Sequence, residues 1–271
     1  MNNHITTNTT FADLVDSWLE QLRAEGRLEN TTINEYERVL RRLVLPDLGK
    51  IRLAELTTDG INTVLAHLGT QSINRQRKAK VVTGAMLDVA VERGALASNP
   101  VRGSISVIRP KNEARALTLA DLETVRTAVR AWMTKDRPGP KASDDLADVI
   151  ELMLATGARI GEVLSFRWSD VDLDAQTVEI NATIKSETSK GTYRKSLASA
   201  RTVDLPDLAV AVLRRRRSGA RASALDAVFP TRNGTWQQVN NVERRWRQIR
   251  QEAGLDWVTP HAFRSHAGPT A

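Results

Sequence analysis

The sequence contains no cysteine, only two tyrosines and no long apolar run. Without cysteine, the chain has no disulfide framework, no thiol nucleophile and no thiolate-ligated metal. No apolar stretch approaches the roughly 20 residues that a membrane-spanning helix requires. The residues after Met1 are polar, which is unlike a secretory signal peptide. We therefore expect a cytoplasmic protein without a membrane partner.

The charge balance is basic. The 271 residues include 39 Lys and Arg against 32 Asp and Glu, a formal net charge of +7, and 41% of them are hydrophobic. Residues 1–102 contribute +1 and residues 103–271 contribute +6. Such a balance favours a polyanionic partner, with nucleic acid as the first candidate, although a merely soluble basic protein has the same composition. The length is sufficient for two domains with cores of ordinary size.

The spacing of apolar residues divides the chain. Between residues 10 and 94 a 3.6-residue period predicts four amphipathic helices, and after residue 170 short alternating stretches predict strands at 177–184 and 201–206. We predict a mostly α protein with a small antiparallel β-sheet. Its parts are a disordered N-terminus (residues 1–9), a helical domain (10–102), a linker (103–117) and a second domain (118–271).

One sharp corner in the second domain is a candidate site. An apolar, helix-like run at residues 149–154 leads to Gly157, which permits a tight turn without steric cost. Apolar residues then recur at helical spacing, which predicts a second helix with Arg159 in its first turn. An arginine on a rigid corner suits a fixed phosphate clamp. Glu162, one helical step later, is interpreted as structural or as orienting a neighbouring basic group.

Three more polar residues complete a candidate set with Arg159: Lys195 in a basic hairpin tip, and His261 and Arg264 near residue 260. Two arginines can hold the non-bridging oxygens of one phosphate and stabilise charge that develops in phosphoryl transfer. A lysine can protonate a leaving alkoxide, and a histidine can shuttle a proton. Each residue alone also has a structural explanation, as a surface ion pair or a solvated cation. The set lacks paired carboxylates and metal-ligand clusters, so neither a metal nor a cofactor is predicted.

The order of these motifs resembles that of the tyrosine recombinases, the phage integrase type of site-specific DNA recombinase. ATGARIGEVL at residues 155–164 is similar to the family's first arginine box, and HAFR at 261–264 is similar to the second. The segment from Lys195 to Pro206 is similar to the hairpin that carries the catalytic lysine. The helical domain at 10–102 resembles the family's SAM-like core-binding domain. The resemblance covers about residues 10–264.

The resemblance implies a role for each residue of the set. Arg159 and Arg264 would activate the scissile phosphate of duplex DNA, Lys195 would act as general acid on the leaving 5′ oxygen, and His261 would assist proton transfer. The family nucleophile is a tyrosine, located after the second arginine, that forms a 3′-phosphotyrosyl link without a metal or nucleotide cofactor. Four protomers act on two duplexes in the family, so a homo-tetramer on DNA is the implied assembly of full-length relatives.

The chain departs from this pattern at its tyrosines, which are Tyr36 and Tyr193 only, both before Arg264. We therefore expect a C-terminally truncated recombinase, as in a prophage remnant, that clamps DNA but does not cleave it alone. An alternative is a degenerate recombinase that acts only as a DNA-binding module or regulator. A basic phosphotransferase is disfavoured, because the sequence has no glycine-rich phosphate loop and no acidic metal ligands.

Basic segments outside the site are candidates for contacts to the DNA backbone. Contacts of this type supply affinity and salt dependence rather than sequence choice. The run of arginines at residues 214–217 is interpreted as a solvated helix face, with DNA contact as the alternative. The predicted DNA-binding residues are Arg75, Arg77, Lys78 and Lys80 in the helical domain, Arg109 and Lys111 in the linker, and Arg244 and Arg247 in a late helix.

Overall fold

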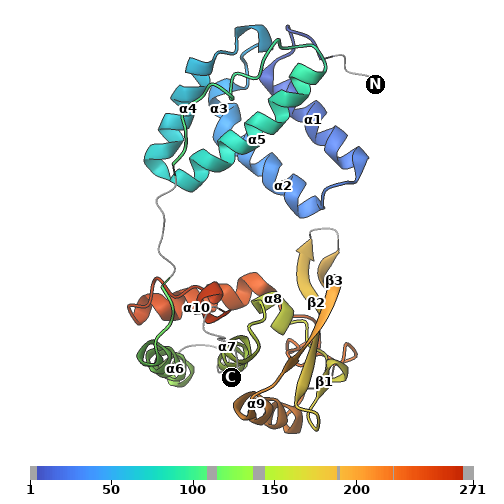
Figure 1. Ribbon diagram of the computed structural model, residues 1–271, viewed down its shortest axis with the longest axis vertical. Coiled ribbons are helices and arrows are strands. Elements are labelled where there is room, and N and C mark those ends of the chain that lie inside the picture. Colours follow the sequence, from blue (N-terminus) through green and yellow to red (C-terminus); the bar gives the residue numbers. More distant parts are fainter. Residues whose placement is uncertain (1–4, 109–114, 137–143, 188–189, 222, 265–271) are drawn as a thin grey trace. The chain divides into compact units, whose positions relative to one another are not determined.

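The structure, a computed structural model, describes residues 5–108, 115–136, 144–187, 190–221 and 223–264. Its contacts divide the chain into two compact units, Met1–Asn112 and Glu113–Ala271. Each unit closes around an apolar core of its own. Helices build the first unit, and helices with a small antiparallel sheet build the second (Figure 1). The predicted fold class is thus confirmed.

The first unit is helical because its apolar residues recur at helical spacing and bury one face of each long helix. Thr10 caps the first helix: its hydroxyl accepts from the Asp13 N–H and donates to the Asp13 carboxylate at 2.6 Å. The elements are α1 (Phe11–Glu25), α2 (Asn30–Val39), the π-helical turn η1 (Leu40–Val44), α3 (Leu45–Leu48), the 3₁₀ turn η2 (Leu53–Glu55), α4 (Thr58–Gln71) and α5 (Ile73–Glu92).

Residues 5–9 differ from the predicted disorder. Ile5 is 4% exposed and belongs to the core of the first unit. The carbonyl oxygen of Thr9 accepts a hydrogen bond from the Leu53 N–H at 3.0 Å, and further backbone contacts of this type join the two segments. A single buried isoleucine and backbone pairing hold this stretch in place, and a polar composition does not reveal either.

The boundaries of the predicted linker, residues 103–117, also differ. The Lys80 ammonium donates to the carbonyl oxygen of Ile105 at 2.7 Å, and the Ile105 N–H donates to the Asn62 side chain at 2.8 Å. These contacts attach the start of the segment to the first unit. At its other end, Leu117 is 3% exposed in the core of the second unit. The connection between the units is therefore shorter than predicted.

The second unit packs helices around a three-stranded sheet whose order is β1-β2-β3, with both pairs antiparallel. The two long strands pair from Thr177 with Asp204 to Glu187 with Gly191, so they extend well beyond the predicted stretches. The elements are α6 (Leu119–Thr134), α7 (Asp145–Thr156), α8 (Ile160–Val163), the 3₁₀ turn η3 (Trp168–Asp170), β1 (Val171–Asp172), β2 (Thr177–Glu187), β3 (Gly191–Asp204), α9 (Asp207–Ser218), α10 (Val239–Glu252) and α11 (Pro260–Arg264).

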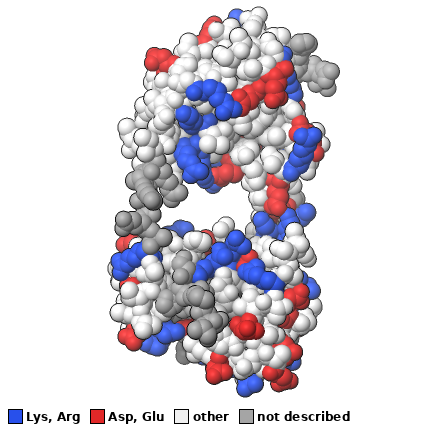
Figure 2. Space-filling model, in the orientation of Figure 1, with Lys and Arg blue, Asp and Glu red and all other residues white. Residues whose placement is uncertain are grey.

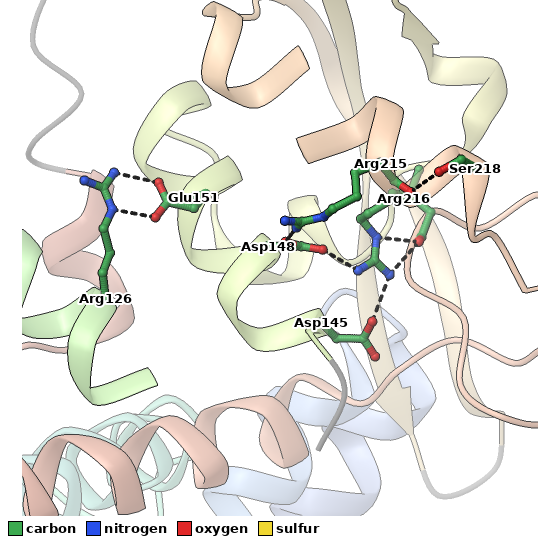
Figure 3. A network of polar contacts seen from close by, with 8 residues as sticks. Arg126, Asp145, Asp148, Glu151, Arg215, Arg216 and Ser218 are labelled. Atoms are coloured by element: carbon green, nitrogen blue, oxygen red, sulfur yellow. Dashed lines mark hydrogen bonds and ion pairs between the residues drawn. The ribbon is translucent and has the colours of Figure 1, made fainter. Parts of the chain in front are cut away.

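An ionic network fastens α9 to α7 (Figure 3). The Arg216 guanidinium donates to Asp148 at 2.7 Å, to Asp145 at 2.8 Å and to the carbonyl oxygen of Val228. Arg215 pairs with the other oxygen of Asp148. The side chain of Arg216 is only 13% exposed. Part of the arginine run at 214–217 therefore points inward, which neither the predicted solvated face nor the DNA-contact alternative anticipates.

Candidate phosphate-binding site

The corner between α7 and α8 places Arg159. Gly157 ends α7 in the left-handed region at φ 62°, where a side chain would be strained. Ala158 is fully buried, and Arg159 follows in an extended conformation as the N-cap of α8. The Arg159 side chain is 65% exposed. The predicted sharp turn is present, and Arg159 lies one position before the helix rather than inside its first turn.

The buried side chain of Glu162 stabilises the corner between α7 and α8. Its carboxylate is 1% exposed and accepts from the Arg159 N–H at 2.9 Å and from the Arg159 guanidinium at 2.9 Å. It also accepts from the Arg201 guanidinium at 2.7 Å. Burial alone raises the pKa of Glu162, but the hydrogen bonds from Arg159 and Arg201 and the charge of Arg201 outweigh burial and lower the pKa below its ordinary value. Glu162 is thus an ionised, buried anchor for two arginines.

Arg264 joins the same corner from α11. Its Nε donates to the carbonyl oxygen of Gly157 at 2.8 Å, across 107 positions of sequence. The neighbouring Phe263 is 1% exposed and tilts against Trp246 with ring centroids 5.3 Å apart. This packing fixes α11, which also carries the exposed His261. The two predicted arginine motifs therefore meet at one turn of the backbone.

Lys195 lies within β3, not in a hairpin tip as predicted, and pairs with Thr183 of β2. Directly opposite residues of an antiparallel pair project to the same face of the sheet. A Cβ on Gly161 of α8 would lie 2.7 Å from the Thr183 hydroxyl, so α8 closely approaches the residue that pairs with Lys195, and a glycine permits this approach. Lys195 thus lies opposite a residue that the helix after Arg159 approaches closely.

Arg194 is a further residue of the site region that the sequence did not single out. Its side chain is 13% exposed and pairs with Asp170 at 2.9 Å. Its Nε donates to the carbonyl oxygen of Ser165 at 3.0 Å, just after α8. Arg194 connects the strand that carries Lys195 to the end of α8. The sequence offers no signal for this role, because a buried and a solvated arginine in a strand can have the same local sequence pattern.

The predicted DNA-contact residues of the first unit lie on α5. Arg75, Arg77 and Lys78 are exposed, and Lys78 pairs with Glu35 of α2 at 2.6 Å. Lys80 is half-buried, because its ammonium binds the backbone after α5. A groove of about 430 Å³ runs between the two helices; its lining residues are Glu35, Arg38, Val39, Arg42, Leu43, Arg75 and Lys78.

In the second unit, Arg244 and Arg247 are exposed on α10, while Trp246 between them is buried. Lys and Arg side chains gather over the region of α8 and α10 on the face that Figure 2 shows. Arg109 and Lys111 lie outside the described residues.

Both tyrosines have defined surroundings. Tyr36 packs on the core of the first unit and stacks on Trp18 with ring centroids 5.7 Å apart. The Tyr193 hydroxyl donates to Glu187 at 2.6 Å, and the Lys190 ammonium lies 5.5 Å from the Tyr193 ring centroid. Within the described residues, no group of three or more His, Asp or Glu side chains is arranged to hold a metal ion. In the same part of the chain, no helix is both long and apolar enough for a bilayer span.

Two family models match this chain, one mainly in each of its two units. Residues 129–269, more than half of the sequence, match the phage integrase family, and residues 10–68 match the phage integrase N-terminal SAM-like domain. The chain is 24% identical to the tyrosine recombinase XerC-like protein of Caldanaerobacter subterraneus, over 95% of this chain and 71% of the relative.

Two solved structures show the same fold. The Tn1549 transposon integrase in complex with transposon right end DNA has a TM-score of 0.77 at 17% identity, over 96% of this chain and 85% of that one. A lambda integrase tetramer bound to a Holliday junction has a TM-score of 0.70 at 16% identity, over 96% and 72% of the two chains.

Proposed function

Because the chain belongs to the phage integrase family, we propose that it binds duplex DNA and holds one phosphodiester between Arg159 and Arg264. Forked hydrogen bonds from two guanidinium groups can bind the non-bridging oxygens and stabilise charge that develops on them. In this proposal Lys195 protonates a leaving 5′ oxygen, and His261 assists the proton transfer. No metal or organic cofactor takes part in this proposal.

The observation that carries the proposal is the hydrogen bond from Arg264 to the Gly157 carbonyl. It brings the second arginine motif to the backbone turn that presents Arg159. Glu162 orients Arg159 from the buried side and leaves most of its side chain exposed. In this proposal the two arginines at one corner bind a single tetrahedral anion together, rather than act as two separate surface charges.

Exposed cations on both units support a duplex partner. Arg75, Arg77 and Lys78 on α5 and Arg244 and Arg247 on α10 are available for phosphate contacts. The similar Tn1549 and lambda integrases are described in complex with DNA, the lambda enzyme as a tetramer on a Holliday junction. We extend DNA binding to this chain, and assembly of four copies on DNA is the corresponding expectation for its oligomeric state.

We further propose that the 271-residue chain does not cleave DNA alone. Its two tyrosines are the candidate nucleophiles, and each is engaged elsewhere. Tyr36 packs on the core of the first unit, and the Tyr193 hydroxyl is bonded to Glu187. The phosphate clamp is therefore proposed to bind and polarise a phosphodiester without an attacking group of its own.

The proposal is tested by selecting a preferred duplex from a randomised pool and titrating it with the protein. Wild-type protein should bind with an affinity that falls steeply with salt. Arg159→Ala and Arg264→Ala should each weaken binding about tenfold or more, the value of one charged hydrogen bond. Arg232→Ala, an exposed arginine of the same unit, is the matched control and should change little.

On a nicked copy of the selected site, no covalent protein–DNA adduct should form. An adduct abolished by Tyr193→Phe would overturn the proposed lack of cleavage. A wild-type protein without DNA affinity would overturn the proposed function itself. Undiminished binding by Arg159→Ala would instead favour a DNA-binding module that no longer uses the clamp.

A further inference from the structure

The buried carboxylate of Glu162 holds a second arginine beside Arg159. The Arg159 guanidinium binds one carboxylate oxygen at 2.9 Å, and the Arg201 guanidinium binds the other at 2.7 Å. The two oxygens of one carboxylate are adjacent, so the two guanidinium groups are brought to neighbouring positions. Arg201 lies 42 positions after Arg159 in the sequence, in a different element, and the fold alone places them together.

Arg201 is both fixed in position and accessible. Its backbone pairs with Ile180, which is 1% exposed in the core, so the strand cannot shift without disrupting buried packing. Its side chain is nevertheless 41% exposed. The hydrogen bond described for Arg201 engages Nη2 only, and a guanidinium carries several further N–H donors. Those donors are available to an anion that approaches from solvent.

The local charges are not balanced within the protein. Arg159 and Arg201 each contribute one positive charge, and Glu162 contributes one negative charge. This group of three therefore keeps one net positive charge, while Arg264 adds another at the same corner. A phosphodiester carries a single negative charge, so the DNA backbone supplies the complement that the protein lacks. In the network on α9, by contrast, Asp145 and Asp148 balance the charges of Arg215 and Arg216, which leaves no such surplus.

We propose that Arg201 is a second phosphate-contacting arginine of this site, which binds the DNA backbone beside the phosphate held by Arg159. The inference rests on the proposed function. It assigns two tasks to Glu162: orienting Arg159 and spacing a neighbouring cation for the same strand of DNA. Arg201 thereby contributes to affinity and to placement of the backbone, without a role in proton transfer.

The alternative is that Arg201 only neutralises Glu162, and the test separates these roles in a Glu162→Gln background. Without the carboxylate charge there is nothing to neutralise, so a structural role is absent. Binding to a fluorescein-labelled, mixed-sequence duplex is measured by anisotropy over a range of salt concentrations. Each phosphate contact contributes about 0.9 to the slope of log affinity against log salt.

Adding Arg201→Gln to Glu162→Gln should lower the magnitude of this slope by about 0.9. Adding Arg214→Gln, an exposed arginine on α9, should leave the slope unchanged. An unchanged slope for Arg201→Gln, or an equal loss for Arg214→Gln, would overturn the inference. Failure of the wild-type protein to bind any duplex would instead overturn the proposed function, so the two failures are distinguishable.

A second pair of variants covers the case in which Glu162→Gln does not fold. In the native background, Arg201→Lys should retain the wild-type slope, because it keeps the charge, whereas Arg201→Gln should lose about 0.9. Thermal unfolding midpoints of both variants show whether the fold is kept. Equal slopes for the lysine and glutamine variants would contradict the inference.

Discussion

The two units bury polar groups of different kinds. Among the described residues of the first unit, the buried polar side chains are neutral: Thr83, Asn99 and Ser104. In the second unit they include three carboxylates, Asp145, Asp148 and Glu162. An ionised carboxylate is costly to bury unless it is paired and hydrogen-bonded.

Each of these carboxylates is bound by an arginine. The first unit is thus held mainly by apolar packing, whereas the second adds to its apolar core buried carboxylates that need their arginine partners.

The largest effect of this difference is expected at Arg216. Arg216→Ala leaves Asp145 and Asp148 without their shared partner, so the free energy of unfolding should fall by about 3–5 kcal/mol. Urea unfolding followed by tryptophan fluorescence measures the loss. Arg214→Ala, its exposed neighbour on α9, should stay within about 0.5 kcal/mol of wild type. Similar losses for both variants would show that the buried network does not stabilise the second unit.

A smaller, pH-dependent effect is expected at Glu162. Glu162→Gln removes the charge that receives two arginines, and the unfolding free energy at neutral pH should fall by about 2–3 kcal/mol. Because the pKa of Glu162 is lower in the folded protein than its ordinary value of 4.5, its stabilisation is present above pH 4.5. It disappears as the pH falls below that value through the folded pKa. Urea midpoints of wild type and variant should therefore converge in acid, and a constant difference would contradict this assignment.

A partly exposed ion pair of the second unit should matter less. Arg126 and Glu151 join α6 to α7 through two parallel hydrogen bonds of 2.7 and 2.8 Å (Figure 3), with 37% and 16% of the side chains exposed. Arg126→Met keeps the aliphatic stem and should cost about 1 kcal/mol, since solvent screens the pair. The same urea measurement applies. If Arg126→Met lowered the unfolding free energy as much as Arg216→Ala does, the difference in burial would not explain how strongly each ion pair stabilises the fold.

The smallest stability effect is expected in the first unit, at Lys78. Its ion pair with Glu35 is exposed, with 58% of the lysine side chain accessible. Lys78→Ala should change the unfolding free energy by less than about 0.5 kcal/mol. The variant should nevertheless lower the salt slope of DNA binding by about 0.9 if Lys78 contacts a phosphate. Lys50→Ala, an exposed lysine of the same unit, should leave both quantities unchanged.

The two units also differ in how much of their structure could be predicted from sequence. The helices of the first unit follow from apolar spacing and from caps such as Thr10. A helix that buries one face has apolar residues at a period of about 3.6 residues, and this period is visible in the local sequence. In the second unit the turn at Gly157 was equally local, since a left-handed residue strongly favours glycine. By contrast, Arg194, Arg201 and Arg216 could not be distinguished from solvated arginines. Their carboxylate partners are 24 to 71 positions away in the sequence.

The sequence by itself determined the helical class, the small sheet, the basic character and the motifs that contain Arg159, Lys195, His261 and Arg264. Those features depend on composition, local periods and short spacings. Only the tertiary structure decided that Arg264 meets the turn of Arg159, that Lys195 pairs with Thr183 inside a long strand, and that Glu162 holds Arg201 as well. The physical reason is that a charge acquires its role from its partners and its exposure, and long-range packing sets both.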